Sequence, residues 1–416
     1  MATSVQDMVR PGECIDLYYY DGETNKKQCF GTTVNTRYVQ QFANLNGGSS
    51  VFTIPPQNGI QDCIITLVAP SLAGGDGAEL ALNRGWGYAL IKQVSFRYGG
   101  SSQYFLTGDQ ILQNALRKQT SRTSSNDILS LGGSQLNDAE LEGVNPVANV
   151  VLTLPHNIPS GVGKAHPLPT DALTQQVQIT VELLPLSAIV SNNTGGALPA
   201  AYLAGLSAAQ FQIQQVMLNN QGDALARRVD MATNAYSFPL EFVQQKQVIP
   251  LANSAASQSV VLTGFRSGEV KAIHIWLTRT GDSTGNTKNL NYWYVPDSVQ
   301  MTYAGEIFAR FDAGSSTLWN LINSNKSPAV DTVFLTYGGG AYTATPQVSE
   351  WVELPFAQTM VDEDAHYTLV HGKPITNGIV NLDITTPSAQ ADWVLNVSYI
   401  YNATLLFSQG SCDYVF

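Results

Sequence analysis

The sequence predicts an all-β protein that consists of two similar antiparallel sandwiches in tandem. Three observations support this prediction: short segments with alternating apolar and polar residues, few segments of helical periodicity, and one unit that occurs twice. A chain of 416 residues also exceeds the length that a single hydrophobic core usually supports. We therefore expect two domains of about 200 residues each.

The repeated unit is a strand, a glycine turn and a short amphipathic helix. In its first copy, apolar side chains alternate with polar ones at Val94, Phe96 and Tyr98. The pair Gly99-Gly100 then ends the strand, because glycine tolerates the positive φ angles of a sharp turn. Apolar residues follow at helical spacing, namely Ile111, Leu112, Ala115 and Leu116. Either Thr107 or Asp109 can cap this helix.

The second copy begins 299 − 94 = 205 residues later, where Val299–Gly305 matches Val94–Gly100. Three apolar residues again follow the turn and predict a second helix: Leu318, Leu321 and Ile322. Two more pairs of segments repeat in the same order: Leu152–Pro155 with Val352–Pro355, and Val177–Val181 with Val380–Ile384. A repeat of this length that occurs twice indicates duplicated domains rather than a solenoid.

The first half is expected to comprise an N-terminal arm over residues 1–35 and a sandwich over 36–222. Its strand-like segments are Tyr38–Leu45, Val51–Ile54, Cys63–Val68, Tyr88–Tyr98, Val150–Leu154, Val177–Leu183 and Phe211–Leu218. Residues 119–145 and 187–209 are rich in small and polar residues, so we predict long loops there. Residues 223–235 are predicted to link the two halves.

The second half, over residues 236–416, repeats this order. Its strand-like segments are Phe238–Val248, Ser259–Thr263, Ala272–Leu277, Val299–Tyr303, Trp351–Leu354, Val380–Ile384 and Trp393–Phe407. The number of short strands and the shortage of helices predict that each half is an eight-stranded antiparallel jelly roll with short helices in its loops.

Charged residues are scarce, at 13% of the chain against about 25% in typical soluble domains. An uncharged polar surface is buried against a partner at a lower desolvation cost than a charged one, so this composition favours self-assembly. The net charge is −11, and Lys and Arg cluster only at Lys26-Lys27 and Arg227-Arg228. This distribution argues against direct nucleic-acid binding and against attraction to an anionic membrane.

The cysteines and the apolar segments indicate a soluble protein made inside a cell. Cys14, Cys29, Cys63 and Cys412 match no zinc or redox spacing, and we expect reduced, buried thiols. Charged residues interrupt any apolar run near the N-terminus, so no signal peptide is predicted. The apolar stretch 197–209 is too short to span a membrane, and membrane insertion is not expected.

No catalytic constellation is visible, and we predict no enzyme, no cofactor and no catalytic or metal-binding residue. The sequence lacks a phosphate-binding loop and a nucleophile elbow. One titratable cluster contains Asp362, Glu363, Asp364, His366 and His371. These residue types suit Zn²⁺ or Ca²⁺, but their spacing matches no ligand pattern. A solvated acidic loop is the favoured interpretation.

Two further sets of residues have a functional and a structural interpretation. Four triplets match the N-glycosylation pattern, at Asn192, Asn325, Asn396 and Asn402. Chance matches are favoured in an Asn- and Thr-rich chain without a signal peptide. Four tryptophans could stack on sugars, namely Trp276, Trp293, Trp351 and Trp393. Core packing is favoured, because three of them lie in or beside apolar strands.

The order of these segments resembles the double-jelly-roll major capsid proteins of icosahedral double-stranded DNA viruses, especially the nucleocytoplasmic large DNA viruses and their smaller eukaryotic relatives. Ala89–Gly100 followed by Gly108–Leu112 is similar to the family's strand, Gly-Gly turn and helix. The segments Leu152–Pro155, Pro167–Pro169 and Ile179–Leu183 also resemble the family pattern. So do the C-terminal segments Trp393–Leu406, Ser408–Gly410 and Tyr414–Phe416. The resemblance covers roughly residues 38–416, whereas residues 1–35 match no arm of the family.

The resemblance implies a homotrimer whose six jelly rolls form a pseudo-hexagonal capsomer of an icosahedral shell. It also implies neighbouring trimers, penton proteins and minor capsid or cement proteins as partners, and a location in the virion after production in the host cell. Contacts between chains are expected in the N-terminal arm and in loops 119–145 and 187–209. Two alternatives remain at this point: another β-sandwich virion component, such as a minor capsid or fibre protein, and a carbohydrate-binding sandwich protein.

Overall fold

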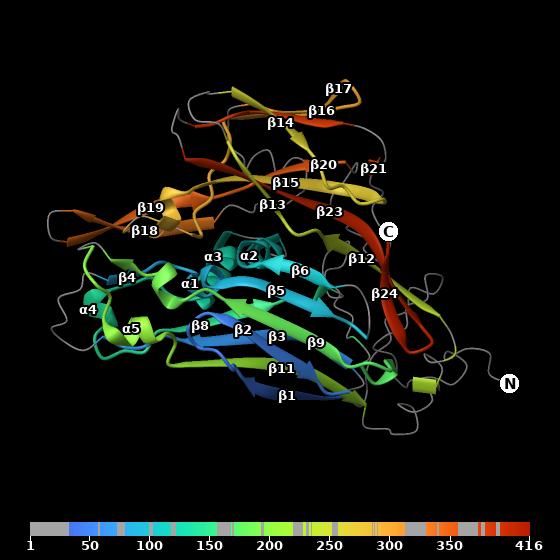
Figure 1. Cartoon of the computed structure of the whole chain (residues 1–416), viewed down its shortest axis with the longest axis horizontal. Coiled ribbons are helices and arrows are strands. Elements are labelled where there is room, and N and C mark those ends of the chain that lie inside the picture. Colours follow the sequence, from blue (N-terminus) through green and yellow to red (C-terminus); the bar gives the residue numbers. More distant parts are fainter. Residues whose placement is uncertain are drawn as a thin grey trace.

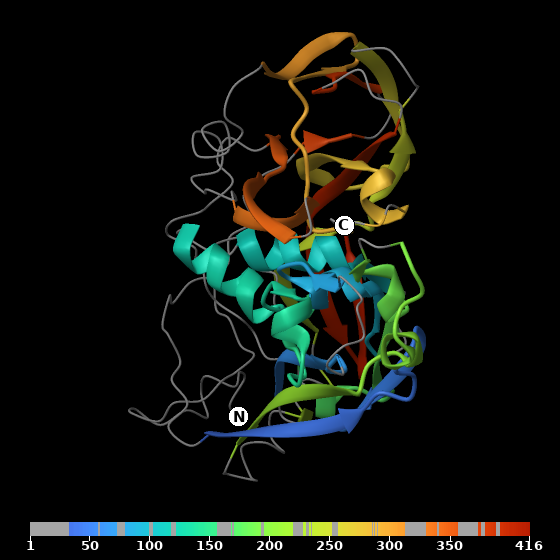
Figure 2. The same ribbon diagram turned by 90° about the vertical axis from the view of Figure 1, so that its left-hand side faces the viewer.

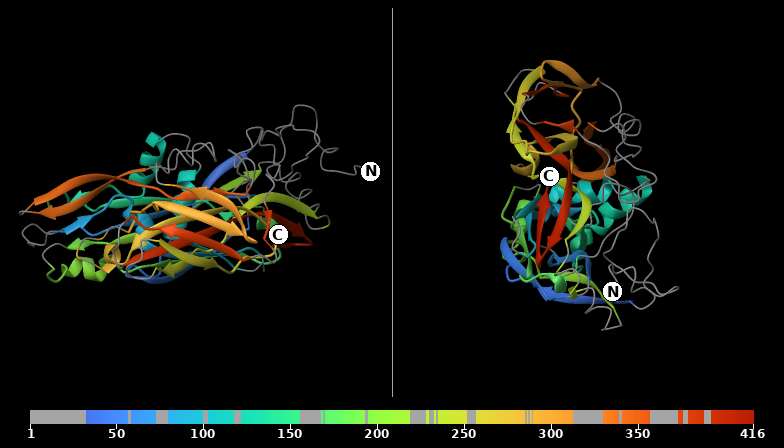
Figure 3. Two further views of the ribbon diagram at one scale, coloured as in Figure 1. Left: turned by 90° about the horizontal axis from the view of Figure 1, so that it is seen from above. Right: turned by 90° about the vertical axis from the view of Figure 1, so that its right-hand side faces the viewer.

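A computed structural model represents the whole chain. The structure describes residues 33–56, 59–72, 80–99, 103–117, 122–155, 168, 170–192, 195–218, 228–229, 233, 235–251, 257–284, 286, 288, 290–312, 330–338, 341–356, 373–375, 379–387 and 392–416. Two sandwiches lie one above the other, and the strands of both run roughly along the long axis of the molecule (Figures 1 and 3).

The first sandwich consists of two four-stranded antiparallel sheets. One sheet has the spatial order β1 (Thr33–Gln41), β11 (Ala208–Leu218), β3 (Gly59–Val68) and β8 (Val147–Leu152). The other has the order β2 (Gly48–Ile54), β9 (Val177–Leu183), β5 (Ile91–Arg97) and β6 (Tyr104–Thr107). This connectivity is that of an eight-stranded jelly roll. A small third sheet joins β10 (Ser191–Asn192), β4 (Leu80–Leu82) and β7 (Leu136–Asn137) at one end.

The second sandwich repeats the same connectivity. One sheet has the order β12 (Tyr236–Val243), β23 (Trp393–Ser408), β15 (Glu269–Arg279) and β20 (Val352–Pro355). Strand β13 (Gln247–Pro250) continues β12 along β23, so the two count as one jelly-roll strand. The other sheet has the order β14 (Ser257–Leu262), β22 (Val380–Thr385), β16 (Ser298–Tyr303) and β17 (Glu306–Phe311). The prediction of two tandem jelly rolls is confirmed.

Two strands and a hairpin add to this framework. The short β21 (Lys373–Pro374) pairs with β15, and β24 (Ser411–Val415) pairs with the end of β23. Strands β18 (Val330–Gly338) and β19 (Ala341–Ser349) form a hairpin between β17 and β20.

The repeated segments of the sequence occupy equivalent places in the two jelly rolls. Strands β5 and β16 have the same position in their sheets, and so do β3 and β15, β8 and β20, and β9 and β22. The turns after β5 and β16 also correspond, because Gly99 and Ala304, its equivalent at the shift of 205, have φ angles of 48° and 51°. The predicted linker 223–235 lies mostly outside the described residues, and its limits stay a prediction.

The helices lie in the connections between strands. They are α1 (Trp86–Leu90), α2 (Gly108–Arg117), α3 (Arg122–Leu131), α4 (Asp138–Leu141), α5 (Ala200–Ala204) and α7 (Gly281–Thr284), with 3₁₀ turns at Thr170–Ala172 and Leu186–Ala188. The helix predicted after Gly99-Gly100 is therefore confirmed as α2. The second predicted helix, at residues 318–322, lies outside the described residues.

Three local predictions were wrong. Helix α3 occupies much of the segment 119–145 that was predicted as a loop, and α5 occupies part of 187–209. In α3, the packing of the fully buried Leu129 stabilises a helix whose Ser and Asn residues have weak helix propensity. The strand expected from Tyr88 begins only at Ile91, because α1 precedes it.

Candidate functional site: the buried junction between the jelly rolls

The second jelly roll contacts the first through the sheet β12-β23-β15-β20. The four main sheets and the intervening helices form successive layers, in which α2 and α3 lie between this sheet and the first jelly roll (Figures 1 and 2). Residues Val270–Leu277 of β15 are all buried, although a strand places alternate side chains on opposite faces. The sheet therefore has one face in its own core and the other in the junction.

Four charged side chains and one histidine form a cluster in this junction. Arg117, the last residue of α2, donates to Glu241 of β12 at 2.9 Å, and its Nε lies 3.5 Å from Glu353 of β20. Lys271 of β15 also pairs with Glu241, and His274 of β15 contacts Glu353 at 2.7 Å between Nε2 and Oε2. The two cations and two carboxylates balance in charge, which a buried cluster requires.

A β-bulge helps to assemble this cluster. The register between β15 and β23 shifts between Val270 and Ala272, so the shift falls at Lys271. A bulge re-aims the side chain of the extra residue, and here the fully buried ammonium group of Lys271 contacts Glu241. The bulge thus places a buried charge between the apolar residues Val270 and Ala272.

The cluster changes the protonation equilibria of its members. Burial alone raises the pKa of Glu241, but the charges and hydrogen bonds of Arg117 and Lys271 outweigh burial and lower this pKa to about 2. Burial lowers the pKa of His274 below its ordinary value, and the contact with Glu353 offsets this effect only in part. At neutral pH, His274 is therefore uncharged, and its Nε2–H donates to the Glu353 carboxylate.

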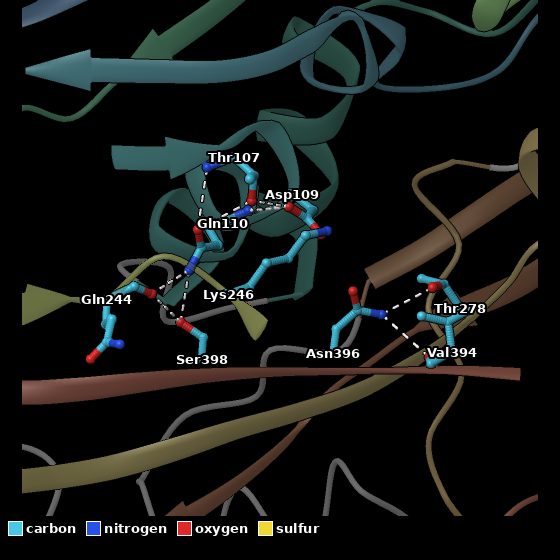
Figure 4. Close-up of polar contacts among 9 residues, drawn as sticks. All are labelled: Thr107, Asp109, Gln110, Gln244, Lys246, Thr278, Val394, Asn396 and Ser398. Carbon is cyan, nitrogen blue, oxygen red and sulfur yellow. Dashed lines mark hydrogen bonds and ion pairs between the residues drawn. The ribbon is translucent and has the colours of Figure 1, made fainter. Parts of the chain in front are cut away.

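A second polar contact lies at the beginning of α2 (Figure 4). The fully buried Gln110 uses its amide nitrogen to donate to the carbonyl oxygen of Gln244 at 2.7 Å and to Oγ of Ser398 at 2.8 Å. Its amide oxygen accepts from the backbone N–H of Thr107 at 3.2 Å, which is one half of a capping box. Gln110 therefore both caps the helix and fastens it to the second jelly roll.

Three further groups of contacts extend the junction. Asp109 pairs with Lys246 beside Gln110 (Figure 4). The ring of Tyr104 lies 4.5 Å from that of Phe242, and the hydroxyl of Tyr104 accepts from the backbone N–H of Val243 at 3.1 Å. Beside the start of α1, the amide nitrogen of Asn291 donates to the carbonyl oxygen of Gly85 at 2.6 Å. The two jelly rolls are thus joined by polar and aromatic contacts along much of their length.

A cavity of about 330 Å³ lies in the same junction. Its lining includes three cationic side chains, and each has an acidic partner within the chain: Lys92 with Glu182, Lys246 with Asp109 and Arg279 with Asp392. Because these charges are balanced internally, the cavity does not present an anion-binding site. Within the described part of the chain, no group of three His, Cys, Asp or Glu side chains is arranged to hold a metal ion.

Of the candidate site residues from the sequence, some lie outside the described residues and the others are buried. The acidic cluster with His366 and His371 lies outside the described residues, as does Asn325. The other three candidate glycosylation asparagines are buried, and the side-chain amide of each donates a hydrogen bond within the chain: Asn192 to Gly196, Asn396 to Thr278 and Asn402 to Glu269. The four tryptophans are 0–4% exposed, so they pack in the interior.

The two cysteines that the structure describes are buried thiols. Cys63 and Cys412 are free and buried, and burial raises the pKa of both thiols. Cys14 and Cys29 lie outside the described residues. Among the helices that the structure describes, none combines the length and apolarity that a membrane crossing requires.

The cluster in the junction was missed at the sequence level, although a signal was present. In a chain with few charges, Lys271 and Glu353 each stand between apolar residues of a strand. A charge in such a place is normally paired when it is buried. The partner could not be identified, because Arg117 is 236 residues away from Glu353 in the sequence (353 − 117).

No sequence-family model and no curated protein sequence matches the chain. Similar solved structures are capsid proteins. The PBCV-1 virus capsid structure is 15% identical, with a TM-score of 0.65 over 92% of this chain and 97% of that chain. The Faustovirus major capsid protein is 10% identical, with a TM-score of 0.54 over 94% and 92%. The mavirus major capsid protein is 9% identical, with a TM-score of 0.50 over 99% and 93%.

The fold is therefore that of the double-jelly-roll major capsid proteins. The similarity spans nearly the full length of this chain and of each compared chain. It confirms the resemblance that the order of the sequence segments indicated.

Proposed function

We propose that this protein is a major capsid protein that forms homotrimers and tiles the icosahedral shell of a double-stranded DNA virus. One observation carries the proposal: two similar jelly rolls are stacked in one chain with the same order of layers and a buried, charge-balanced junction (Figure 1). Three such chains supply six similar domains, which is what a threefold molecule needs to fill a sixfold lattice position.

The similarity to capsid structures over more than nine-tenths of the chain supports the same proposal. We infer a location in the virion after production in the host cell, and neighbouring trimers, penton proteins and minor capsid or cement proteins as partners. The scarcity of charged residues and the absence of a catalytic constellation in the sequence support a structural protein that neither catalyses a reaction nor binds nucleic acid directly.

Light scattering after gel filtration, with negative-stain images of the peak, tests the proposal. We expect a stable species of 3 × 44.9 ≈ 135 kDa with a pseudo-hexagonal outline. Co-expression with the virus's other capsid components extends the test if the purified chain is monomeric, because some shells require a scaffold. A chain that stays monomeric in both settings would contradict the proposal.

A carbohydrate-binding sandwich protein is the alternative function, and a glycan array tests it directly. The burial of all four tryptophans considered as sugar platforms removes the residues that favoured it.

A further inference from the structure

The cavity of about 330 Å³ in the junction is large enough to hold a small molecule. Its lining comes mainly from β5 and the start of α2 in the first jelly roll, and from residues 278–280, 282–283 and 290–292 in the second. Two of these residues, Asp282 and Ser283, belong to α7, whose residues are exposed or half-buried. The cavity is therefore accessible from solvent beside α7, and a ligand in it contacts both jelly rolls.

The charges of the lining disfavour a charged ligand. Each of its three cationic side chains is paired with a carboxylate of the chain, as the contact of Lys246 with Asp109 illustrates (Figure 4). An anion in the cavity would have to compete with these carboxylates, and a cation would lie beside three like charges. A ligand without net charge avoids both costs.

One acceptor on a lining residue has no hydrogen-bond partner within the described part of the chain. This acceptor is Oδ2 of Asp282, which is buried. A buried acceptor is normally satisfied by a donor. Burial raises the pKa of Asp282, and the nearby charge of Arg279 offsets this effect only in part. A hydroxyl group of a ligand would supply a donor to Oδ2 without bringing a second cation next to Arg279.

Aromatic and aliphatic side chains complete the lining. The ring of Tyr292 lies 4.2 Å from that of Tyr294, and the ring of Tyr294 lies 4.9 Å from that of Trp393. These contacts hold Tyr292 in place, whereas Trp393 is buried and does not line the cavity. A sugar ring combines an apolar C–H face, which packs on an aromatic ring, with hydroxyl groups around its edge. The aliphatic part of the lining includes Ile91, Leu184, Leu290 and Val394.

We infer that the junction cavity binds one residue of a neutral carbohydrate. A hydroxyl group of the sugar donates to Oδ2 of Asp282, and the apolar face of the sugar packs against Tyr292. Because the cavity lies between the jelly rolls, the bound sugar links them. The same chemistry fits a free sugar and the terminal residue of a longer glycan. The inference goes beyond the proposed function and does not depend on the trimer.

Saturation-transfer NMR on the wild-type chain tests for binding. The neutral probes are the methyl glycosides of glucose, galactose and mannose, and the charged probes are glucosamine and glucuronate. We expect at least one neutral probe to bind with a dissociation constant on the order of 1 mM, as a small and weakly held ligand does. We expect both charged probes to bind about tenfold more weakly or worse. If no neutral probe bound, or if a charged probe bound more tightly, the inference would be wrong.

Two neighbouring residues of α7 provide a matched pair of variants. The hydroxyls of Ser283 and Thr284 donate to the carbonyl oxygen of Thr280 at 2.9 and 3.0 Å, and both residues are exposed. Of the two, only Ser283 lines the cavity. We expect Ser283→Trp to block the cavity and abolish sugar binding, and Thr284→Trp to keep the wild-type affinity. Both variants should retain the wild-type native mass. Equal sugar affinities of the two variants would overturn the inference.

The carboxylate of Asp282 is tested separately. Asp282→Ala removes the acceptor, and we expect about tenfold weaker sugar binding, because a hydrogen bond to a charged group is lost. The control is Asp312→Ala, which removes a carboxylate that is 63% exposed and lies outside the cavity. An unchanged affinity in Asp282→Ala would contradict the inference, because the acceptor that selects a hydroxyl-bearing ligand would play no part.

An array of immobilised neutral glycans separates the two sources of the sugar. Array binding that Ser283→Trp abolishes identifies the terminal residue of a glycan, whereas binding of the methyl glycosides alone identifies a free sugar; both results support the inference. The native mass of the same samples separates it from the proposed function. Trimers that bind no sugar overturn the inference and leave the proposed function standing. A chain that binds sugar but stays monomeric under every condition tested above does the reverse.

Discussion

The two jelly rolls place equivalent strands in different environments. In the first, the outward residues of β11 and β3 are only half-buried, whereas the equivalent β23 and β15 of the second are buried on both faces. The outward side of β11 carries Gln210, Gln212 and Gln214, but β23 and β15 place His274, Asn396 and Ser398 in the junction. The duplicated scaffold has thus diverged on its surface while its strand order has remained the same.

The comparison teaches that a polar residue in a strand does not by itself mark a solvent-facing side. Both sheets alternate apolar and polar side chains, yet the polar side of one is covered. The covered side differs in that partners of its side chains come from the other jelly roll: Arg117 pairs with Glu241, and Gln110 donates to Ser398. Partners of this kind are needed because an unpaired polar group in the interior is costly.

The largest expected effect comes from breaking the charge cluster. Glu241→Ala leaves the buried cations of Arg117 and Lys271 without their shared partner, and we expect a loss of about 3–5 kcal/mol in the free energy of unfolding. Urea denaturation at a fixed chain concentration measures it. Glu182→Ala is the control, because its ion pair with Lys92 is largely exposed (33% and 55%), and should cost at most about 1 kcal/mol. Equal losses in the two variants would show that the junction does not differ from the surface.

A smaller effect is expected from the amide that fastens α2. Gln110→Ala removes two hydrogen bonds to the second jelly roll and the capping interaction with Thr107. We expect a loss of about 1–3 kcal/mol in unfolding free energy, because the buried Ser398 and Gln244 groups each lose a partner. The matched change on the uncovered sheet is Gln212→Ala, for which a change within about 0.5 kcal/mol is expected. If Gln212→Ala lowered the free energy of unfolding as much as Gln110→Ala, polar side chains would contribute equally on the uncovered sheet and in the junction.

The smallest expected effect is a pH dependence of stability that comes from the buried His274 in the junction. The folded state lowers the pKa of His274, so the unfolded state binds more protons below the ordinary histidine pKa. The contribution of neutral His274 to the free energy of unfolding is complete above about pH 6.5. It is lost as the pH falls towards the lowered pKa of His274. Glu241, with a pKa of about 2, stays charged in this range.

We therefore expect acidification from pH 7.5 to 5.5 to lower the urea midpoint less in His274→Gln than in the wild type. The difference between the two chains isolates His274 from the other four histidines. Parallel pH dependence of the two midpoints would contradict the assignment of His274 as a buried neutral group.

Much of the fold could be predicted from the sequence because the relevant signals are local. The alternation in Val94–Tyr98, the glycine turn after it and the helical spacing of Ile111 to Leu116 each depend on a few neighbouring residues. The duplication then placed these units in order twice. The segment containing α3 was misread because its helix depends on Leu129, which packs against distant residues, rather than on local propensity.

The sequence by itself therefore determined the number of jelly rolls, the order of their strands and the shortage of charge that favours assembly. The tertiary structure alone decided which sheet face is covered. Alternation shows that one side of a strand is apolar, but it carries no information about what lies over the other side. The packing of the two jelly rolls brought Arg117, Glu241 and Glu353 together, although each is more than 100 residues from the next in the sequence. It left the outward side chains of the sheet β1-β11-β3-β8 exposed or half-buried. Only the packing of one jelly roll on the other could distinguish a surface charge from a buried ion pair.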